Sequence, residues 1–221
     1  MQTRVDPIAD GIFRLSTFMP EIGPTGFAFN QFLVDADEPL LFHTGMRSLF
    51  PLVREAIERI TPVERLRWIS FAHIEADECG AMNEFLEAAP TAEVAHGVLG
   101  CQLTLNDQAA RLPRALMPGE ALELGGGKRV VEIPTPHVPH NWESHMLFEE
   151  STRTLFCGDI LTQLGNPEPL VSHDIIEAAT EAEAVFGQTS VGPKIPATLR
   201  QLAELQPQRL ADHGRIARIG G

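Results

Sequence analysis

The segment from 66 to 78 places a hydrophobic run directly before a cluster of ionisable side chains. LRWISFA, residues 66–72, has the composition of a buried strand, and HIEADE follows it at once. His73, Glu75 and Asp77 occupy alternate positions in this cluster. Because alternate side chains of extended backbone point to one side, we expect all three to face one site at the strand end. A helix would turn Glu75 away from the other two.

Strand-like and helix-like segments alternate along the rest of the chain, which favours a layered α/β architecture. The run 119–133 predicts a β-hairpin, and its glycines 125–127 supply the positive φ of the turn. We give these glycines no nucleotide-binding role, because the G-x-G-x-x-G pattern and a following helix are both missing. We expect further strands at 12–17, 27–35, 39–45, 66–72, 92–97, 145–151 and 154–159, helices at 48–60, 80–89, 175–187 and 195–205, and a surface loop at 162–174.

Composition limits the class of protein. A chain of 221 residues suits one α/β domain, so we expect a single domain over 1–221. The net charge of −13 would repel phosphate backbones and argues against a nucleic-acid partner. The apolar runs are too short to span a membrane, and Asp6, Pro7 and Asp10 interrupt any secretory signal. With three cysteines and no CxxC pair, these features predict a cytoplasmic protein without a membrane partner.

Helix capping is a simpler explanation for the acidic residues of the 73–78 cluster. Asp77 and Glu78 precede a predicted helix, where carboxylates cap free N–H groups and complement the helix dipole. Capping explains neither His73 nor Glu75, which would be polar groups at the mouth of an apolar strand. We therefore favour a ligand cluster.

Further candidate ligands follow later strands. Imidazoles and carboxylates gathered at strand ends can close two adjacent metal sites. These candidates are His137, His140 and His145 in PTPHVPHNWESH, Asp159 in CGD, and His213 in DHG.

The ordered set of these motifs resembles the metallo-β-lactamase superfamily, and within it the flavodiiron or oxygen-binding di-iron branch. The set is H-x-E-x-D, then a histidine in H-x-x-E-S, then Asp159 in GD, and finally HG. The superfamily norm is H-x-H-x-D-H, and Glu75 stands at its second histidine, as in flavodiiron proteins. The resemblance spans most of the chain and implies a four-layer αββα sandwich.

The resemblance also implies a ligand set for two metal ions. In the family, a small hydroxyl residue follows the ligand histidine by four positions. Ser144 stands four positions after His140, whereas Asn141 stands four positions after His137, so His140 is preferred. The implied ligands are His73, Glu75 and His140 for one metal, Asp77 and His213 for the other, and Asp159 as the bridge.

Two positions depart from the superfamily pattern. Glu78 stands where a second histidine is usual, so the second metal either gains a carboxylate or is completed by water. His43, in HTG, stands where D-x-G is common, and we expect it to support packing or the turn. Carboxylates at 75, 77 and 159 favour iron, with zinc or manganese as alternatives. Trp142 is a candidate for the mouth of the pocket.

Three functions remain open at this point. The resemblance implies a di-iron protein that binds or reduces O2 or NO. Because 221 residues leave no room for a flavodoxin domain and its FMN, the protein is expected to be either an oxidoreductase that receives electrons from a separate flavoprotein or a sensor without turnover. The resemblance also makes a homodimer reasonable. The alternative is a hydrolase that opens a thioester, lactone or phosphoester with a metal-bridging hydroxide. A metal-stabilised binding protein is the third possibility, and the near-complete ligand set disfavours it.

Overall fold

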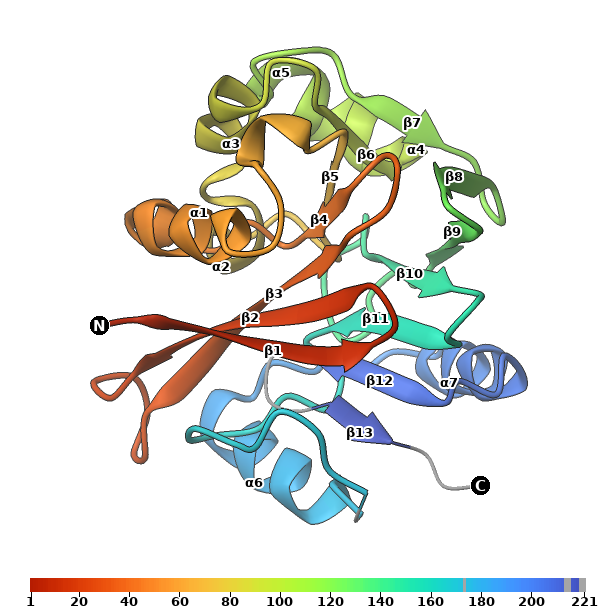
Figure 1. The fold of residues 1–221 in the computed structure, drawn as a ribbon. Helices are drawn as coiled ribbons and strands as arrows, with labels where there is room; N and C mark the ends of the chain where they lie inside the picture. The colour runs from red at the N-terminus through yellow and green to blue at the C-terminus, as the bar shows by residue number, and fades with distance from the viewer. Residues whose placement is uncertain (173, 213–215, 219–221) are drawn as a thin grey trace.

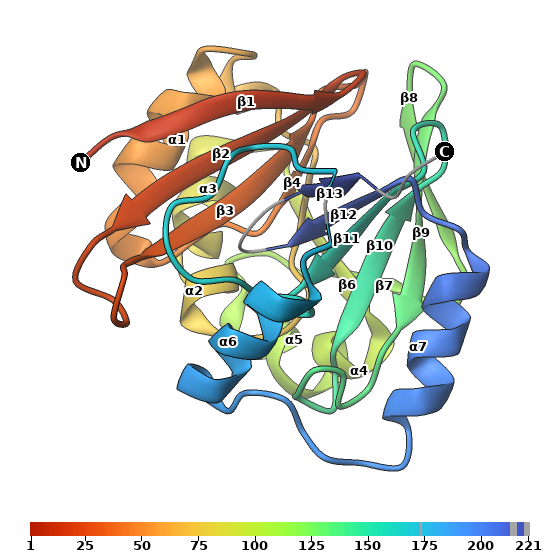
Figure 2. The same ribbon diagram turned by 90° about the horizontal axis from the view of Figure 1, so that it is seen from below.

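Two β-sheets stacked face to face form the centre of the protein, and helices cover both outer faces (Figures 1 and 2). The computed structural model describes residues 1–172, 174–212 and 216–218. The first sheet has the order β1-β2-β3-β4-β5-β6-β7, and the second β13-β12-β11-β10-β9-β8. Both are mixed, because β4 to β7 run parallel in the first and β11 runs parallel to β12 in the second.

The strands of the first sheet are β1 Thr3–Ala9, β2 Ile12–Met19, β3 Phe27–Val34, β4 Leu40–Phe42, β5 Trp68–Ser70, β6 Glu93–Gly97 and β7 Arg114–Leu116. Those of the second are β8 Ala121–Gly125, β9 Lys128–Pro134, β10 His145–Glu149, β11 Thr154–Gly158, β12 Arg209–Asp212 and β13 Ile216–Arg218. The helices are α1 Phe50–Glu58, α2 Ala76–Cys79, α3 Met82–Ala88, α4 Val98–Gly100, α5 Asn106–Gln108, α6 Ile176–Phe186 and α7 Ile195–Glu204, with short turns at Arg47–Leu49, Val63–Arg65 and Cys101–Leu105.

Strand β3 of the first sheet is buried on both faces, and each face enters a different layer. In β3, Phe29 and Leu33 pack in the layer that contains α1 and α3, whereas Phe32 and Val34 pack between the sheets. This follows from the period of two along a strand, because a sheet covered on both sides must be apolar at successive positions.

The second sheet repeats this division. Leu147 of β10 and Phe156 of β11 pack between the sheets, and their neighbours Met146 and Leu155 pack in the layer that contains Leu202 of α7. Three apolar layers therefore separate four layers of secondary structure, and the expected αββα sandwich is confirmed.

Most of the predicted elements are present with shifted ends. Glycines 125–127 form the turn between β8 and β9, as expected, and all three have positive φ. The strand predicted at 66–72 is shorter, since β5 ends at Ser70. Strands β1, β7, β12 and β13 and the helical turns between 98 and 108 were not predicted. Short edge strands and single turns carry too few residues for a clear periodic pattern.

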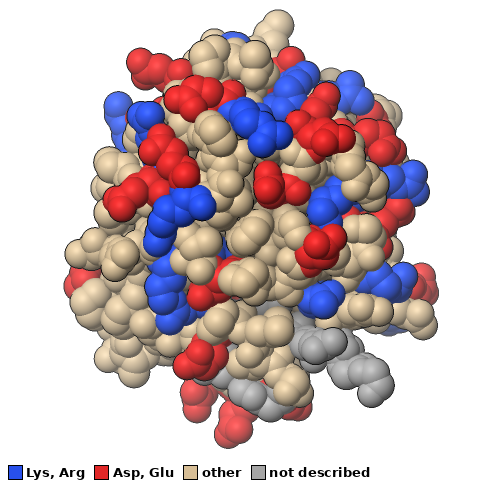
Figure 3. Space-filling model, in the orientation of Figure 1, with Lys and Arg blue, Asp and Glu red and all other residues tan. Residues whose placement is uncertain are grey.

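Charged side chains of both signs are mixed over the face shown in Figure 3. Lys and Arg gather there beside Asp and Glu rather than in one continuous stripe. Across the described part of the chain, no helix is both long enough and apolar enough to cross a membrane.

The contact between the sheets can be tested at Phe156, whose ring centroid lies 5.6 Å from Phe32 and 5.2 Å from Phe42. Phe156→Ala should lower the free energy of unfolding by about 3–5 kcal/mol, because it leaves a cavity between two rigid layers. Leu112→Ala is the control, since that side chain is 76% exposed, and it should change stability by less than about 0.5 kcal/mol. Urea denaturation measures both, and equal midpoints would contradict this account of the core.

Candidate metal centre

The chain leaves β5 at Ser70 and passes through a loop before a short helix begins at Ala76. Glu75 is extended, with φ −132° and ψ 158°, but Asp77 lies in the first turn of α2. The expectation that extended backbone aligns His73, Glu75 and Asp77 is therefore wrong for Asp77. The helix begins at Ala76, so the backbone at Asp77 is helical and not extended.

Two histidines meet at the centre of the site. The Nε2 atoms of His73 and His140 lie 2.9 Å apart, although 67 residues separate them in sequence. The Nδ1 atom of His140 lies 2.9 Å from the carbonyl oxygen of Gln188. Since a carbonyl only accepts, Nδ1 carries the hydrogen, and the neutral ring presents the Nε2 lone pair to the site. The hydroxyl of Ser144 donates to the carbonyl of His140 and holds this loop.

Two carboxylates complete the set of donors. The oxygens of Glu75 lie 3.4 Å from His73 Nε2 and 3.4 Å from His140 Nε2. Asp159, which follows β11, places Oδ2 3.7 Å and 3.6 Å from the same nitrogens. Ligand atoms around a metal ion bound at about 2.1 Å are separated by roughly 3.0–3.5 Å, so this geometry suits one ion. His73, Glu75 and His140 form one of the two groups of potential ligands among the described residues.

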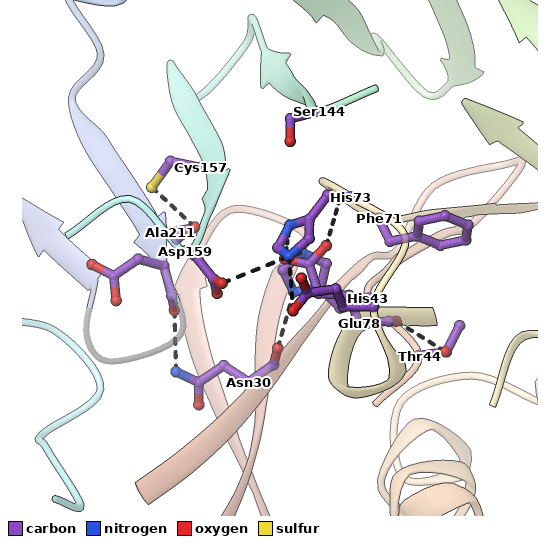
Figure 4. Close-up of polar contacts among 12 residues, drawn as sticks. Asn30, His43, Thr44, Phe71, His73, Glu78, Ser144, Cys157, Asp159 and Ala211 are labelled. Atoms are coloured by element: carbon purple, nitrogen blue, oxygen red, sulfur yellow. Dashed lines mark hydrogen bonds and ion pairs between the residues drawn. The ribbon is translucent and has the colours of Figure 1, made fainter. Parts of the chain in front are cut away.

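Glu78 lies fully buried beneath His73 (Figure 4). Its Oε2 accepts a hydrogen bond from the backbone N–H of His73 at 2.7 Å. Its Oε1 lies 3.2 Å from His73 Nδ1 and 3.2 Å from His43 Nε2. A carboxylate on Nδ1 directs Nε2 toward a metal, as partners of metal-binding histidines commonly do. Glu78 belongs with His73 and Asp159 to the second group of potential ligands.

His43 therefore has a contact that its expected packing role did not specify, because it faces Glu78 from the end of β4. Thr44 fixes this arrangement: its backbone N–H and its hydroxyl both donate to the carbonyl of Glu78, at 2.6 Å and 3.0 Å. Gly158 closes the opposite side, where an added Cβ would lie 2.5 Å from that of Ala72 and 3.3 Å from Glu78 Oε1. The absence of a side chain at 158 lets β11 approach this close.

The charges of the site favour a bound cation. Burial acts to lower the pKa of His73, but the carboxylates of Glu78, Glu75 and Asp159 outweigh it and raise that pKa to about 12. When their Nε2 atoms carry a proton, His140 and His73 donate to Glu75 and hold its pKa well below its usual range. The hydrogen bond to Glu75 raises the pKa of His140. A proton on an imidazole thus takes the position that a metal ion would take.

The structure brings four of the six predicted ligands together, namely His73, Glu75, His140 and Asp159. Asp77 belongs to neither group of potential ligands. His213 lies outside the described residues. The sequence indicates Glu78 as a helix-capping carboxylate or an added ligand of the second metal, whereas its contacts with His73 and His43 appear only in the structure.

The choice of His140 over His137 makes a direct test. His140→Ala should weaken binding of Zn²⁺ or Fe²⁺ at least tenfold, because it removes a nitrogen donor from the set. His137→Ala is the matched control in the same loop and should leave the affinity unchanged. Competition with a chromophoric chelator measures both constants, and an equal loss in the two variants would refute the assignment.

Metal binding should also release protons. Because the pKa of His73 is raised to about 12, its imidazole carries a proton at pH 7, and a metal must displace it. We expect about one or more protons released per ion at pH 7, and affinity that increases with pH. Calorimetric titration with Zn²⁺ in buffers of different ionisation enthalpy counts these protons. A count of zero would contradict the charge assignment.

Solved structures with this fold come from several organisms. The metal-soaked Flv1 flavodiiron core of Synechocystis sp. superposes with a TM-score of 0.82 at 18% identity, over 98% of this chain and 57% of that one. The flavodiiron protein of Giardia intestinalis superposes with a TM-score of 0.85 at 12% identity, over 97% of this chain and 56% of that one. Rubredoxin oxygen:oxidoreductase of Desulfovibrio gigas superposes with a TM-score of 0.82 at 21% identity, over 97% of this chain and 57% of that one.

Sequence comparison gives a consistent result. Diflavin flavoprotein A 1 of Synechocystis sp. is 23% identical over 137 residues, which cover 61% of this chain and 24% of that protein. The chain thus matches about a quarter of the length of such curated relatives. The family profile described as ODP family beta lactamase matches residues 27–211. Since this match covers β3 to β12 and every described residue of the metal centre, the chain belongs to the ODP family of β-lactamase-fold proteins.

Proposed function

We propose that this protein holds a dinuclear non-haem iron centre and uses it to bind or reduce a small diatomic molecule, O2 or NO. The observation that carries the proposal is the position of Glu75, whose carboxylate oxygens lie 3.4 Å from both His73 and His140. Where the superfamily pattern has a histidine, this chain therefore presents an anionic oxygen donor. Hard oxygen donors favour iron or manganese, whereas soft thiolate donors select other metals.

The thiols of the chain add no soft donor. Cys157 precedes Asp159 by two residues, but its Sγ donates to the carbonyl of Ala211 at 3.3 Å, within the layer facing α7 (Figure 4). Burial raises the pKa of the Cys79 thiol to about 12, and no cysteine belongs to either group of potential ligands among the described residues. Zinc and manganese remain chemically acceptable alternatives to iron in the remaining oxygen and nitrogen set.

The second ion would take Asp77, Asp159 and His213, with Asp159 as the bridge. Asp159 is 7% exposed and its Oδ2 lies 3.7 Å from His73 Nε2, and in this proposal one carboxylate oxygen binds each ion. Asp212 ends β12 beside β11, which places the chain next to this edge just before His213. A pair of ferrous ions held by these residues would supply the two electrons that reduction of a small diatomic molecule needs.

The residues of the site also define where a gas molecule would enter. Glu78 and His43 close the site from below, and both side chains are fully buried. The side chain of Glu75 is 45% exposed and that of His140 is 16% exposed, so the site opens to solvent between them. A diatomic molecule would reach the metals there, while the buried carboxylate keeps the ring of His73 in place.

Electron supply follows from the same proposal. We propose that a separate flavoprotein delivers electrons, that its FMN is not bound by residues of this chain, and that two copies of the chain associate as a homodimer. The support is the likeness of the fold to solved flavodiiron structures. The oxygen chemistry stated in the name of the Desulfovibrio gigas relative supports the choice of O2.

Metal analysis with optical spectroscopy on anaerobically purified protein tests the function. We expect two irons per chain and a spectrum that changes on addition of O2 or NO. Bound zinc together with turnover of a thioester, lactone or phosphoester would replace this proposal with the metal-bridging-hydroxide hydrolase. Glu75→Ala should lose the first metal under either function, so it tests the ligand and not the reaction.

Glu75→His distinguishes the two metals more sharply. This change creates the H-x-H-x-D order of the superfamily pattern and removes one negative charge, so the preference for Fe²⁺ over Zn²⁺ should fall at least tenfold. Glu123→Gln, at a side chain that is 72% exposed, controls for the loss of charge elsewhere. Competitive loading with both ions measures the ratio, and an unchanged ratio would contradict the role of Glu75.

A further inference from the structure

A second group of buried ionisable side chains lies at the base of a cavity of about 480 Å³, apart from the metal centre. Glu132 of β9 and His145 of β10 line it, and both are about 98% buried. His96 of β6 packs behind His145, with ring centroids 4.0 Å apart. Neither group of potential metal ligands among the described residues includes these side chains.

The hydrogen of the His145 ring can be placed. Its Nε2 lies 2.9 Å from the carbonyl oxygen of Phe71, which only accepts, so Nε2 carries the hydrogen. In the neutral ring Nδ1 is then an acceptor. This atom is buried and has no hydrogen-bond partner among the described residues.

Glu132 presents a second acceptor to the same space. Its Oε1 lies 3.6 Å from His145 Nδ1, too far for a hydrogen bond, and its Oε2 is buried without a partner in the described part of the chain. Lys194 lines the same cavity, but no ion pair joins it to Glu132 in the described structure. A buried carboxylate without a donor is costly, and an ammonium group could donate to both acceptors.

The walls of the cavity indicate the chemical character of the rest of the bound molecule. They are mainly apolar, and Trp142 stands among them with 58% of its surface exposed. An aromatic face there can pack against an apolar body and attract a cation. The apolar lining residues are Val98, Leu99, Leu116, Pro118, Pro134 and Pro136.

We propose that this cavity binds a small primary amine with an apolar body. Its ammonium group donates to Glu132 and His145, and its body lies against Trp142 and the prolines. A bare metal ion would leave the apolar walls without an occupant. The proposal does not depend on the function of the metal centre, because none of the six residues in the implied ligand set lines the cavity.

Calorimetric titration of the full chain with benzylamine tests the proposal, with benzyl alcohol as the uncharged analogue. We expect one benzylamine per chain and at least tenfold weaker binding of benzyl alcohol, because only the ammonium pairs with the carboxylate. Glu132→Gln should weaken benzylamine at least tenfold. Glu123→Gln on the neighbouring strand β8 is the matched control and should leave the affinity unchanged.

Trp142→Ala provides a second variant at an exposed position, where folding is not at risk, and it should weaken benzylamine several-fold. Absence of benzylamine binding by the unaltered protein up to about 10 mM would overturn the proposal. Equal binding of benzylamine by the unaltered protein and both variants would also overturn it. So would binding of Zn²⁺ that requires Glu132 and His145 and excludes benzylamine, since the cavity would then be a metal site.

Discussion

The geometry of the metal centre depends on the contacts that the buried carboxylate of Glu78 makes with His73. This carboxylate accepts the backbone N–H of His73 and lies 3.2 Å from the Nδ1 of the same residue, so it fixes both the loop and the ring. An anion at this depth is stable only with partners, and His43 and His73 supply them from the ends of β4 and β5. The two departures from the superfamily pattern, His43 and Glu78, thus form one interacting pair.

The layered core explains why these strand ends meet. Strands β4 and β5 are parallel, so His43 and His73 leave the sheet at the same edge. Phe156, packed on Phe32 and Phe42, sets β11 against this sheet and brings Asp159 within reach of His73. Apolar packing between the sheets therefore positions a site whose members come from both.

The sequence predicted the fold and much of the site, and the errors have identifiable causes. His140 could be chosen over His137 because its spacing to Ser144 matches the pattern of the family it resembles, and in the structure the hydroxyl of Ser144 donates to the His140 carbonyl. Asp77 was placed on extended backbone because the start of a four-residue helix leaves too little pattern to detect. The role of Glu78 depends on a contact with His43, 35 positions earlier, which no local pattern reports.

Residues 143–145 connect the metal centre to the cavity at Glu132. The backbone N–H of His145 donates to the carbonyl of Ala72 at 2.9 Å, and Glu143 accepts the N–H of Ile74 at 3.1 Å. The loop that carries His73 is therefore held on one side by Glu78 and on the other by the wall of the cavity. A displacement of residues 143–145 would therefore move both the loop that carries His73 and the wall of the cavity, because both are built on the same three residues.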